Sequence, residues 1–174
     1  AAGMVGSSRG SFAQGTPKRG GTLVATWGGG EPQACYVPAG GGSSPTFSSS
    51  KLFERLALRR MDGQFEGVLA ESWKPSADFK SYTVKIRKGV KFHDGKDMTV
   101  DDVIYSVSEI WKKYAVASAL TDFAGIDSPD ADTVVFKYNN PTPEFFFAST
   151  LCAPVAYIVP KHVFEKQTDL AAFK

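Results

Sequence analysis

Within residues 81–114 the spacing of apolar residues changes from every second position to every third or fourth, and this change restricts the fold strongly. From Ser81 to Arg87 the side chains alternate, with Tyr82, Val84 and Ile86 on one side. Such alternation is typical of a strand that buries one face of a sheet. The segment therefore predicts a sheet with one covered face.

A helix that could cover this face is predicted to begin at Thr99. Thr99 and Asp102 have the spacing of a capping box. Asp101 near the start and Lys112 and Lys113 near the end match the helix dipole. Apolar residues at helical spacing form one stripe: Val100, Val103, Ile104, Val107, Ile110, Trp111 and Tyr114.

The remaining pattern predicts further short elements, so the fold class is α+β, with strands and helices mixed. Val90 and Phe92 are expected to continue the strand over 81–87, and His93–Lys96 to form a polar turn. The other predicted elements are a helix over Lys51–Leu56 ending at the turn Met61–Gly63, strands over Phe123–Asp127 and Thr133–Tyr138, a helix over Pro143–Thr150, a strand over Ala153–Val159 and a helix over Pro160–Gln167.

The first 45 residues have a different composition, because they contain 12 of the 17 glycines. Residues 1–19 are expected to be a flexible tail or a signal-peptide remnant, since Ser11 and Ala13 would suit cleavage before Gln14. Gly21–Gly28 predicts a first strand. The long loop that follows could be functional or a simple linker.

Composition excludes several classes of protein. The chain has 174 residues and a net charge of +2 with dispersed basic residues, which does not predict a nucleic-acid surface. No apolar run is long enough to span a membrane. Cys35 and Cys152 could form a disulfide in an exported protein, worth roughly 3–5 kcal/mol, or remain two unpaired thiols.

Catalysis is not predicted, because neither a phosphate-binding loop nor a G-x-S-x-G motif occurs. His93 beside Asp94 could be a general base in a secreted hydrolase, but no nucleophile accompanies it, and a turn residue is the alternative. His162 is expected on the surface at a helix start. No catalytic residue, metal site or cofactor is therefore expected.

Three blocks of sequence resemble the signature of family 5 extracellular solute-binding proteins, the peptide, dipeptide and nickel receptors of bacterial ABC importers. The similarity extends outward to roughly Gly20–Lys174. The three blocks are Leu69–Trp73, Ser81–Lys96 and Thr99–Ser106.

The resemblance implies a fold like the type II periplasmic binding proteins and a division of the chain. It implies a tail (1–19), a first-lobe strand and Gly-rich cleft loop (20–45), a small α+β second lobe (46–152) and a return segment into the first lobe (153–174). The chain is thus expected to be an N-terminal piece without the large C-terminal lobe. It would be a monomer at full length, with association possible as a fragment.

The same resemblance implies reversible capture of a peptide or peptide-like solute in the periplasm and delivery to a membrane permease. Other ligands in the family would be opine-like compounds, oligosaccharides or chelated nickel, and an adhesion module is a further alternative function. The implied ligand contacts are Glu31, Tyr36, Gly41, Gly42, Ser43, Ala119, Leu120 and Thr121.

Overall fold

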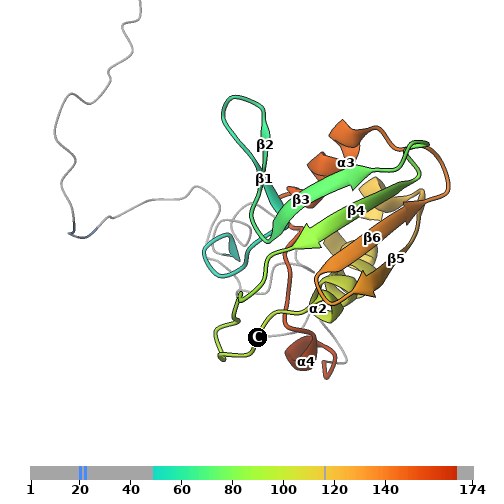
Figure 1. The fold of residues 1–174 in the computed structure, drawn as a ribbon. Helices are drawn as coiled ribbons and strands as arrows, with labels where there is room; N and C mark the ends of the chain where they lie inside the picture. Colours follow the sequence, from blue (N-terminus) through green and yellow to red (C-terminus); the bar gives the residue numbers. More distant parts are fainter. Residues whose placement is uncertain (1–19, 21, 23–48, 116, 168–174) are drawn as a thin grey trace, which may run out of the picture.

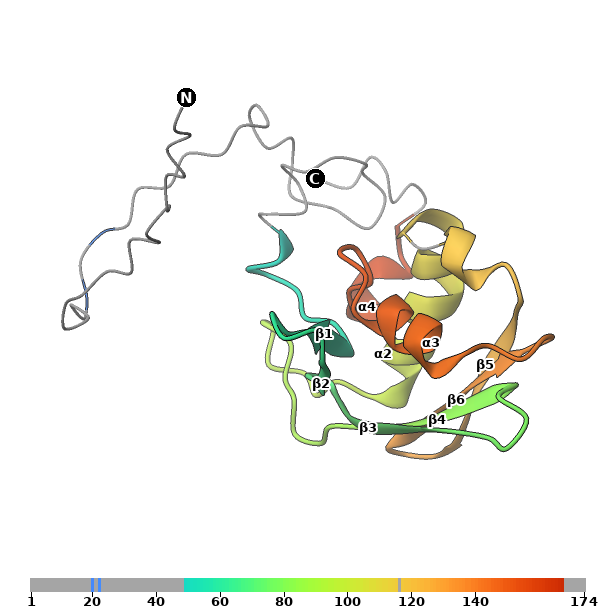
Figure 2. The ribbon, with the colours of Figure 1, turned by 90° about the horizontal axis from the view of Figure 1, so that it is seen from above.

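The computed structural model describes residues 20, 22, 49–115 and 117–167, which form a four-stranded antiparallel sheet with helices on one face and a separate hairpin (Figures 1 and 2). The predicted tail and the predicted strand Gly21–Gly28 lie outside these residues, apart from Thr22. The elements are β1 (Ala57–Arg59), β2 (Phe65–Gly67), β3 (Ala70–Pro75), β4 (Ser81–Ile86), α2 (Val100–Tyr105), η1 (Ser106–Ala115), η2 (Ala117–Leu120), β5 (Phe123–Asp130), β6 (Thr133–Tyr138), α3 (Glu144–Leu151) and α4 (Lys161–Phe164).

The alternation in β4 is confirmed as the centre of the sheet. The strand order is β3-β4-β6-β5, and every neighbouring pair is antiparallel. Tyr82, Val84 and Ile86 are buried, whereas Thr83 is exposed. Val84 lies opposite Val134 in β6, so both strands turn their apolar side chains to the same covered face.

The helix predicted from Thr99 is also confirmed. It begins as α2 with a capping box between Thr99 and Asp102, and it continues into the wider, π-helical turns of η1. Figure 2 shows α2 on the same side of the sheet as α3. The residues of the stripe that are fully buried against the sheet are Val103, Val107, Ile110 and Trp111.

Aromatic rings fill the space between α3 and the sheet. Phe147 of α3 stacks on Tyr82 with ring centroids 3.9 Å apart, and its edge meets Phe136 at 5.3 Å. All three side chains are fully buried. Contacts of this kind stabilise a core by more than the buried area alone provides.

The predicted helix over Lys51–Leu56 is wrong. The chain forms a single turn after Ser49, with the N–H groups of Leu52 and Phe53 both donating to the Ser49 carbonyl. It then becomes extended, and Arg55 forms an antiparallel bridge with Tyr157. The conformation of this segment therefore depends on a partner 102 positions away in the chain and not on local helix propensity.

Two strand predictions also need correction. Val90 and Phe92 do not extend β4, because the chain turns at Lys88–Gly89, where Gly89 has a φ of 72°. Ala153–Val159 is not a strand, although Tyr157 makes the single bridge to Arg55. The helix predicted over Pro160–Gln167 is shorter, since α4 ends at Phe164. The turns Met61–Gly63 and His93–Lys96 are confirmed.

Gly67, the last residue of β2, leads from the hairpin toward β3. This position requires glycine because no side chain would fit there. A Cβ atom at Gly67 would lie 2.1 Å from the carbonyl oxygen of Ala70. This contact is far shorter than van der Waals distance, so any larger residue would push the hairpin away from β3. The hairpin turn itself uses Gly63 with a φ of 86°.

Candidate functional site: a pocket beside the crossing segments

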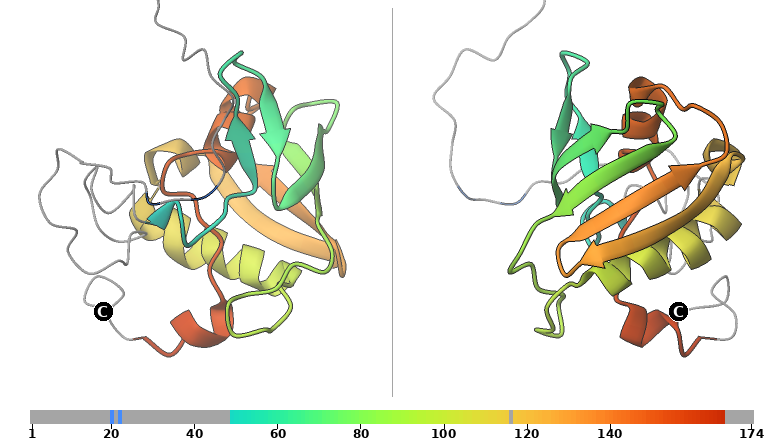
Figure 3. Two further views of the ribbon diagram at one scale, coloured as in Figure 1. Left: turned by 90° about the vertical axis from the view of Figure 1, so that its left-hand side faces the viewer. Right: turned by 45° about the vertical axis from the view of Figure 1, so that its right-hand side comes forward.

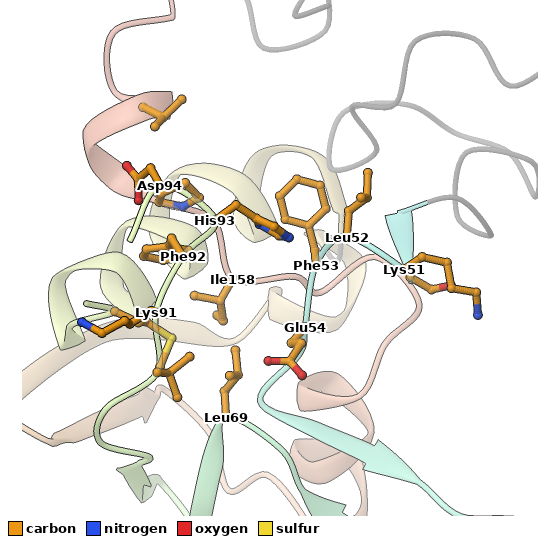
Figure 4. Close-up of a pocket in the computed structure, with 15 residues that line it drawn as sticks. Lys51, Leu52, Phe53, Glu54, Leu69, Lys91, Phe92, His93, Asp94 and Ile158 are labelled. Atoms are coloured by element: carbon orange, nitrogen blue, oxygen red, sulfur yellow. The ribbon is translucent and has the colours of Figure 1, made fainter. Parts of the chain in front are cut away.

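A pocket of about 500 Å³ lies between the incoming segment 50–54, the loop 90–94 and the outgoing segment 158–163 (Figure 4). Leu52 remains 46% exposed at its mouth. Most of the lining is apolar: Leu52, Phe53, Leu69, Val90, Phe92, Met98, Ile158, Pro160 and Val163. The pocket can therefore receive an apolar group.

The loop that forms one wall is held in shape by its own backbone. The Gly95 N–H donates to the Phe92 carbonyl at 2.9 Å, and the Met98 N–H donates to the Val90 carbonyl at 2.8 Å. Gly95 adopts a φ of 86°, a conformation that other residues rarely adopt. These bonds hold the aromatic ring of Phe92 against the pocket (Figure 4).

A side-chain hydrogen bond between His162 and Asp94 closes this loop onto α4. Nε2 of His162 lies 2.6 Å from Oδ2 of Asp94, and Oδ1 of Asp94 accepts the N–H of Lys96 at 3.1 Å. The bond from His162, followed by that from Lys96, lowers the pKa of Asp94 below its usual value. The pair connects residues 68 positions apart and so couples the loop to the outgoing segment.

The outgoing segment is fastened to the long helix by buried polar side chains. Oδ1 of Asp102 accepts the N–H of Lys161 at 2.8 Å, and the Ser106 hydroxyl oxygen accepts the N–H of Val159 at 2.9 Å. The indole N–H of Trp111 donates to the Tyr157 carbonyl at 2.9 Å. Three side chains of α2 and η1 thus form hydrogen bonds with backbone groups of Tyr157, Val159 and Lys161, every second residue of the outgoing segment.

The other side of the outgoing segment faces the incoming segment. The Ile158 N–H donates to the Glu54 carbonyl at 3.0 Å. The Arg55 guanidinium lies 5.2 Å from the ring centroid of Tyr157 and donates to the Cys152 carbonyl at 3.2 Å. The two chain segments therefore cross the domain side by side, and the pocket lies next to them.

The charged side chains beside the pocket do not form a pair between His93 and Asp94. His93 is exposed, and its proposed carboxylate partner, Asp94, pairs with His162 instead. In the described ranges, no three or more His, Cys, Asp or Glu side chains gather to hold a metal ion.

The predicted contact residues fall in two places. Ala119, Leu120 and Thr121 follow the long helix, where Ala119 and Thr121 are exposed and Leu120 is buried. They do not line the pocket. The other predicted contacts, Glu31, Tyr36, Gly41, Gly42 and Ser43, lie outside the described residues.

The proposed disulfide also involves a residue that the structure does not describe, Cys35. Cys152 is half-buried, and burial is the main cause that raises the pKa of its thiol. Its Sγ lies 3.4 Å from the Ser149 carbonyl oxygen. The pairing of the two cysteines stays a prediction.

Sequence reasoning missed two connections at this site. The capping pattern identified Asp102 as the capping-box partner of Thr99, but nothing local indicates that its second oxygen binds Lys161. His162 was expected only as a surface residue, and its partner Asp94 lies in a distant turn. In both cases the partner is remote in sequence, so spacing carries no signal.

The model of a protein family, described as bacterial extracellular solute-binding proteins, family 5 middle, matches residues 64–173. Among curated proteins, the chain is 34% identical over 101 residues to the probable D,D-dipeptide-binding periplasmic protein DdpA of Escherichia coli K12. The matched part is 55% of this chain and 20% of that protein. The chain therefore spans only a fraction of this relative.

Solved structures of two bacterial binding proteins are also similar to this chain. The oligopeptide-binding protein AppA from Bacillus subtilis, in complex with a nonapeptide, is 28% identical with a TM-score of 0.68 over 82% of this chain and 28% of its own. AgaA of A. tumefaciens R10, in complex with agropinic acid, is also 28% identical, with a TM-score of 0.73 over 83% of this chain and 29% of its own. In the described part of our chain, no helix is both long and apolar enough to cross a membrane.

Proposed function

Because the chain belongs to the bacterial extracellular solute-binding proteins of family 5 and has part of their type II periplasmic binding fold, we propose that it is part of the binding component of an ABC importer. The protein captures a peptide or peptide-like solute reversibly in the periplasm and delivers it to a membrane permease. The family match over residues 64–173 carries this proposal. Capture and delivery belong to the whole protein, because this chain covers only 20% of DdpA and 28% of AppA.

In this proposal, residues 46–152 are the small lobe, residues 20–45 precede it and residues 153–174 return to the first lobe. The crossing segments support this division. Arg55 and Tyr157 bridge each other, and the Ile158 N–H binds the Glu54 carbonyl, so the chain enters and leaves the small lobe at one place. A lobe attached in this way moves as one body about that crossing.

The solute contacts in this proposal are main-chain groups of Gly41–Ser43, the exposed residues Ala119 and Thr121, and the residues Glu31 and Tyr36. Backbone pairing would bind peptides of many sequences with similar affinity. The exposure of Ala119 and Thr121 supports their role, whereas the burial of Leu120 suits an anchor of the turn. Opine-like compounds, oligosaccharides and chelated nickel are the alternative solutes.

We infer binding without chemistry. The observation in support is that the Asp94 carboxylate forms its hydrogen bond with His162 and does not orient His93. In the hydrolase alternative, a peptide would be cleaved and His93→Ala would abolish cleavage. In the binding proposal, the peptide is recovered intact and His93→Ala has no effect on capture.

The test is an NMR titration of the amide resonances with three probes: a nonapeptide, a dipeptide and agropinic acid. We expect weak, saturable shifts at Gly41–Ser43 and at Ala119 and Thr121 with at least one probe. Mass spectrometry of the recovered probe shows whether it is intact. Shifts confined to other residues, or a cleaved peptide, would contradict the proposal.

A matched pair of variants separates direct contact from general damage. Ala119→Arg places a long charged side chain in the proposed contact turn and should remove the shifts. Ala124→Arg makes the same change at another exposed alanine, on β5, and should leave them unchanged. Equal loss in both variants would count against a solute site at Ala119.

A further inference from the structure

The pocket beside the crossing segments has no role in the proposed function, because Ala119 and Thr121, the described solute contacts of that proposal, do not line it. Figure 3 shows its red α4 wall at the end of the domain opposite the blue-green hairpin β1–β2. Asp102, near the start of the long helix, accepts the N–H of Lys161 in this wall, whereas Ala119 and Thr121 follow the far end of that helix. A ligand in the pocket would therefore be distinct from the proposed solute.

Glu54 is the unbalanced charge of this pocket. Its side chain is exposed and makes no ion pair with any residue that the structure describes. In Figure 4 its carboxylate lies beside Leu69. Its backbone carbonyl accepts the Ile158 N–H, which anchors the residue at the pocket wall. A carboxylate beside an apolar wall attracts a cation more strongly than one surrounded by water, because the wall lowers the local dielectric constant.

The two lysines that line the pocket do not compensate Glu54. The Lys91 ammonium lies 2.6 Å from a carboxylate oxygen of Asp97, outside the lining. The Lys51 ammonium points away from the other lining side chains in Figure 4. The second acid of the lining, Asp94, already forms a hydrogen bond to α4. The pocket therefore presents one negative charge to a ligand, and that charge is Glu54.

The walls next to Glu54 suit a cation that carries an apolar group. Phe53 lines the pocket from the incoming segment and Phe92 from the loop. The face of an aromatic ring attracts an ammonium group and also contacts an apolar one. The volume of about 500 Å³ is in the range of pockets that take small molecules. Further apolar walls come from Val90, Met98 and Val163.

We propose that this pocket binds a cationic amphiphile, a primary ammonium group attached to one alkyl or aromatic group. The ammonium pairs with the Glu54 carboxylate, and the apolar group lies against Phe53 and Phe92. A carboxylate ligand with the same apolar group is rejected, because its charge repels that of Glu54. This binding does not involve the proposed solute contacts, so its failure would leave the importer function unaffected.

An NMR titration of the full chain with phenethylamine tests the proposal, since this probe is cationic at neutral pH and carries one aromatic ring. We expect saturable shifts of the amide resonances of Glu54, Phe92 and Val163 at millimolar concentrations of the probe. Hydrocinnamate, which carries the same ring on a carboxylate, should give no shifts there. Equal shifts with both probes, or no saturable shifts with phenethylamine, would overturn the proposal.

Glu54→Gln removes the charge and keeps the shape of the side chain. It should weaken phenethylamine binding about tenfold, because the ammonium loses its charged acceptor. Glu71→Gln is the matched control, since Glu71 on β3 is also exposed and lies outside the pocket lining. It should bind the probe like the unmodified chain.

Thermal unfolding of both variants shows whether they are folded, and the comparison of the two probes on the unmodified chain depends on neither variant. The pairing of the ammonium with Glu54 is wrong if Glu54→Gln binds phenethylamine as tightly as the unmodified chain. It is also wrong if both variants lose the same affinity.

Discussion

The two segments that follow β6 are attached to the domain by different forces. α3 is held by packing, because Phe147 contacts both Tyr82 and Phe136. The outer side of the helix remains exposed. The outgoing segment 157–161 is held by hydrogen bonds from buried side chains of the long helix. Only nine residues lie between Phe147 and Tyr157.

The difference lies in what each attachment determines. Hydrophobic burial is less directional than a hydrogen bond, so packing stabilises α3 strongly while Phe145 and Phe146 on its outer side stay exposed. A buried hydrogen bond requires one donor and one acceptor at one distance, so it determines the register of the outgoing segment. In the proposed importer component, this register would set the direction in which the chain leaves the small lobe.

The largest effect should come from the packed attachment. Phe147→Ala is expected to lower the free energy of unfolding by about 3–5 kcal/mol, because it removes a fully buried ring and leaves a cavity. Phe147→Leu should cost only about 1 kcal/mol, since packing tolerates a similar volume. Urea unfolding measures both, and Phe146→Ala on the exposed side should stay within about 0.5 kcal/mol. A large loss in Phe146→Ala would show that the outer side is also covered.

Asp102 should show the next largest effect. Asp102→Ala removes the N3 acceptor of the capping box and leaves the N–H of Lys161 without an acceptor, at a combined cost of about 2–4 kcal/mol. Asp102→Asn retains one oxygen acceptor and should cost less. The same unfolding experiment measures both variants. If Asp102→Ala lowered the free energy of unfolding no more than an alanine substitution at an exposed cap does, the hydrogen bond to Lys161 would not contribute to stability.

Ser106 distinguishes the two kinds of attachment most sharply. Ser106→Ala removes a single oxygen atom, yet it leaves the buried N–H of Val159 unpaired and should cost about 1–2 kcal/mol. Loss of one methyl group from a packed core costs about 0.5–1.5 kcal/mol, and it leaves no polar group unpaired. Amide hydrogen exchange of Val159 should accelerate in the variant while that of Val84 in β4 changes less. Equal acceleration at both amides would indicate a global loss of stability instead.

The smallest effect concerns the hydrogen bond between His162 and Asp94 that connects the pocket loop to α4. The bond from His162 keeps the pKa of Asp94 below the ordinary value of 3.8, so charged Asp94 stabilises the folded loop above that pH. This stabilisation is lost as the pH falls below 3.8 toward the lowered pKa. Asp94→Asn should therefore melt slightly below the unmodified chain at neutral pH and equally with it in acid.

Several elements could be predicted from sequence because their signals are local. The alternation of Tyr82, Val84 and Ile86 identified β4, and Thr99 with Asp102 identified the start of α2. The three sequence blocks also identified the family, which the comparisons confirm. The candidate pocket could not be predicted, since its walls come from segments more than 100 positions apart.

By itself the sequence determined the elements whose apolar residues repeat with the period of a strand or helix, because that period depends only on neighbours in the chain. Only the tertiary structure decided the conformation of 51–56 and 153–159, where Arg55 and Tyr157 satisfy each other across the fold. It also decided that Asp102, Ser106 and Trp111 bind the outgoing backbone. A buried backbone group requires a partner, but which residue supplies it depends on what the folded chain brings within reach.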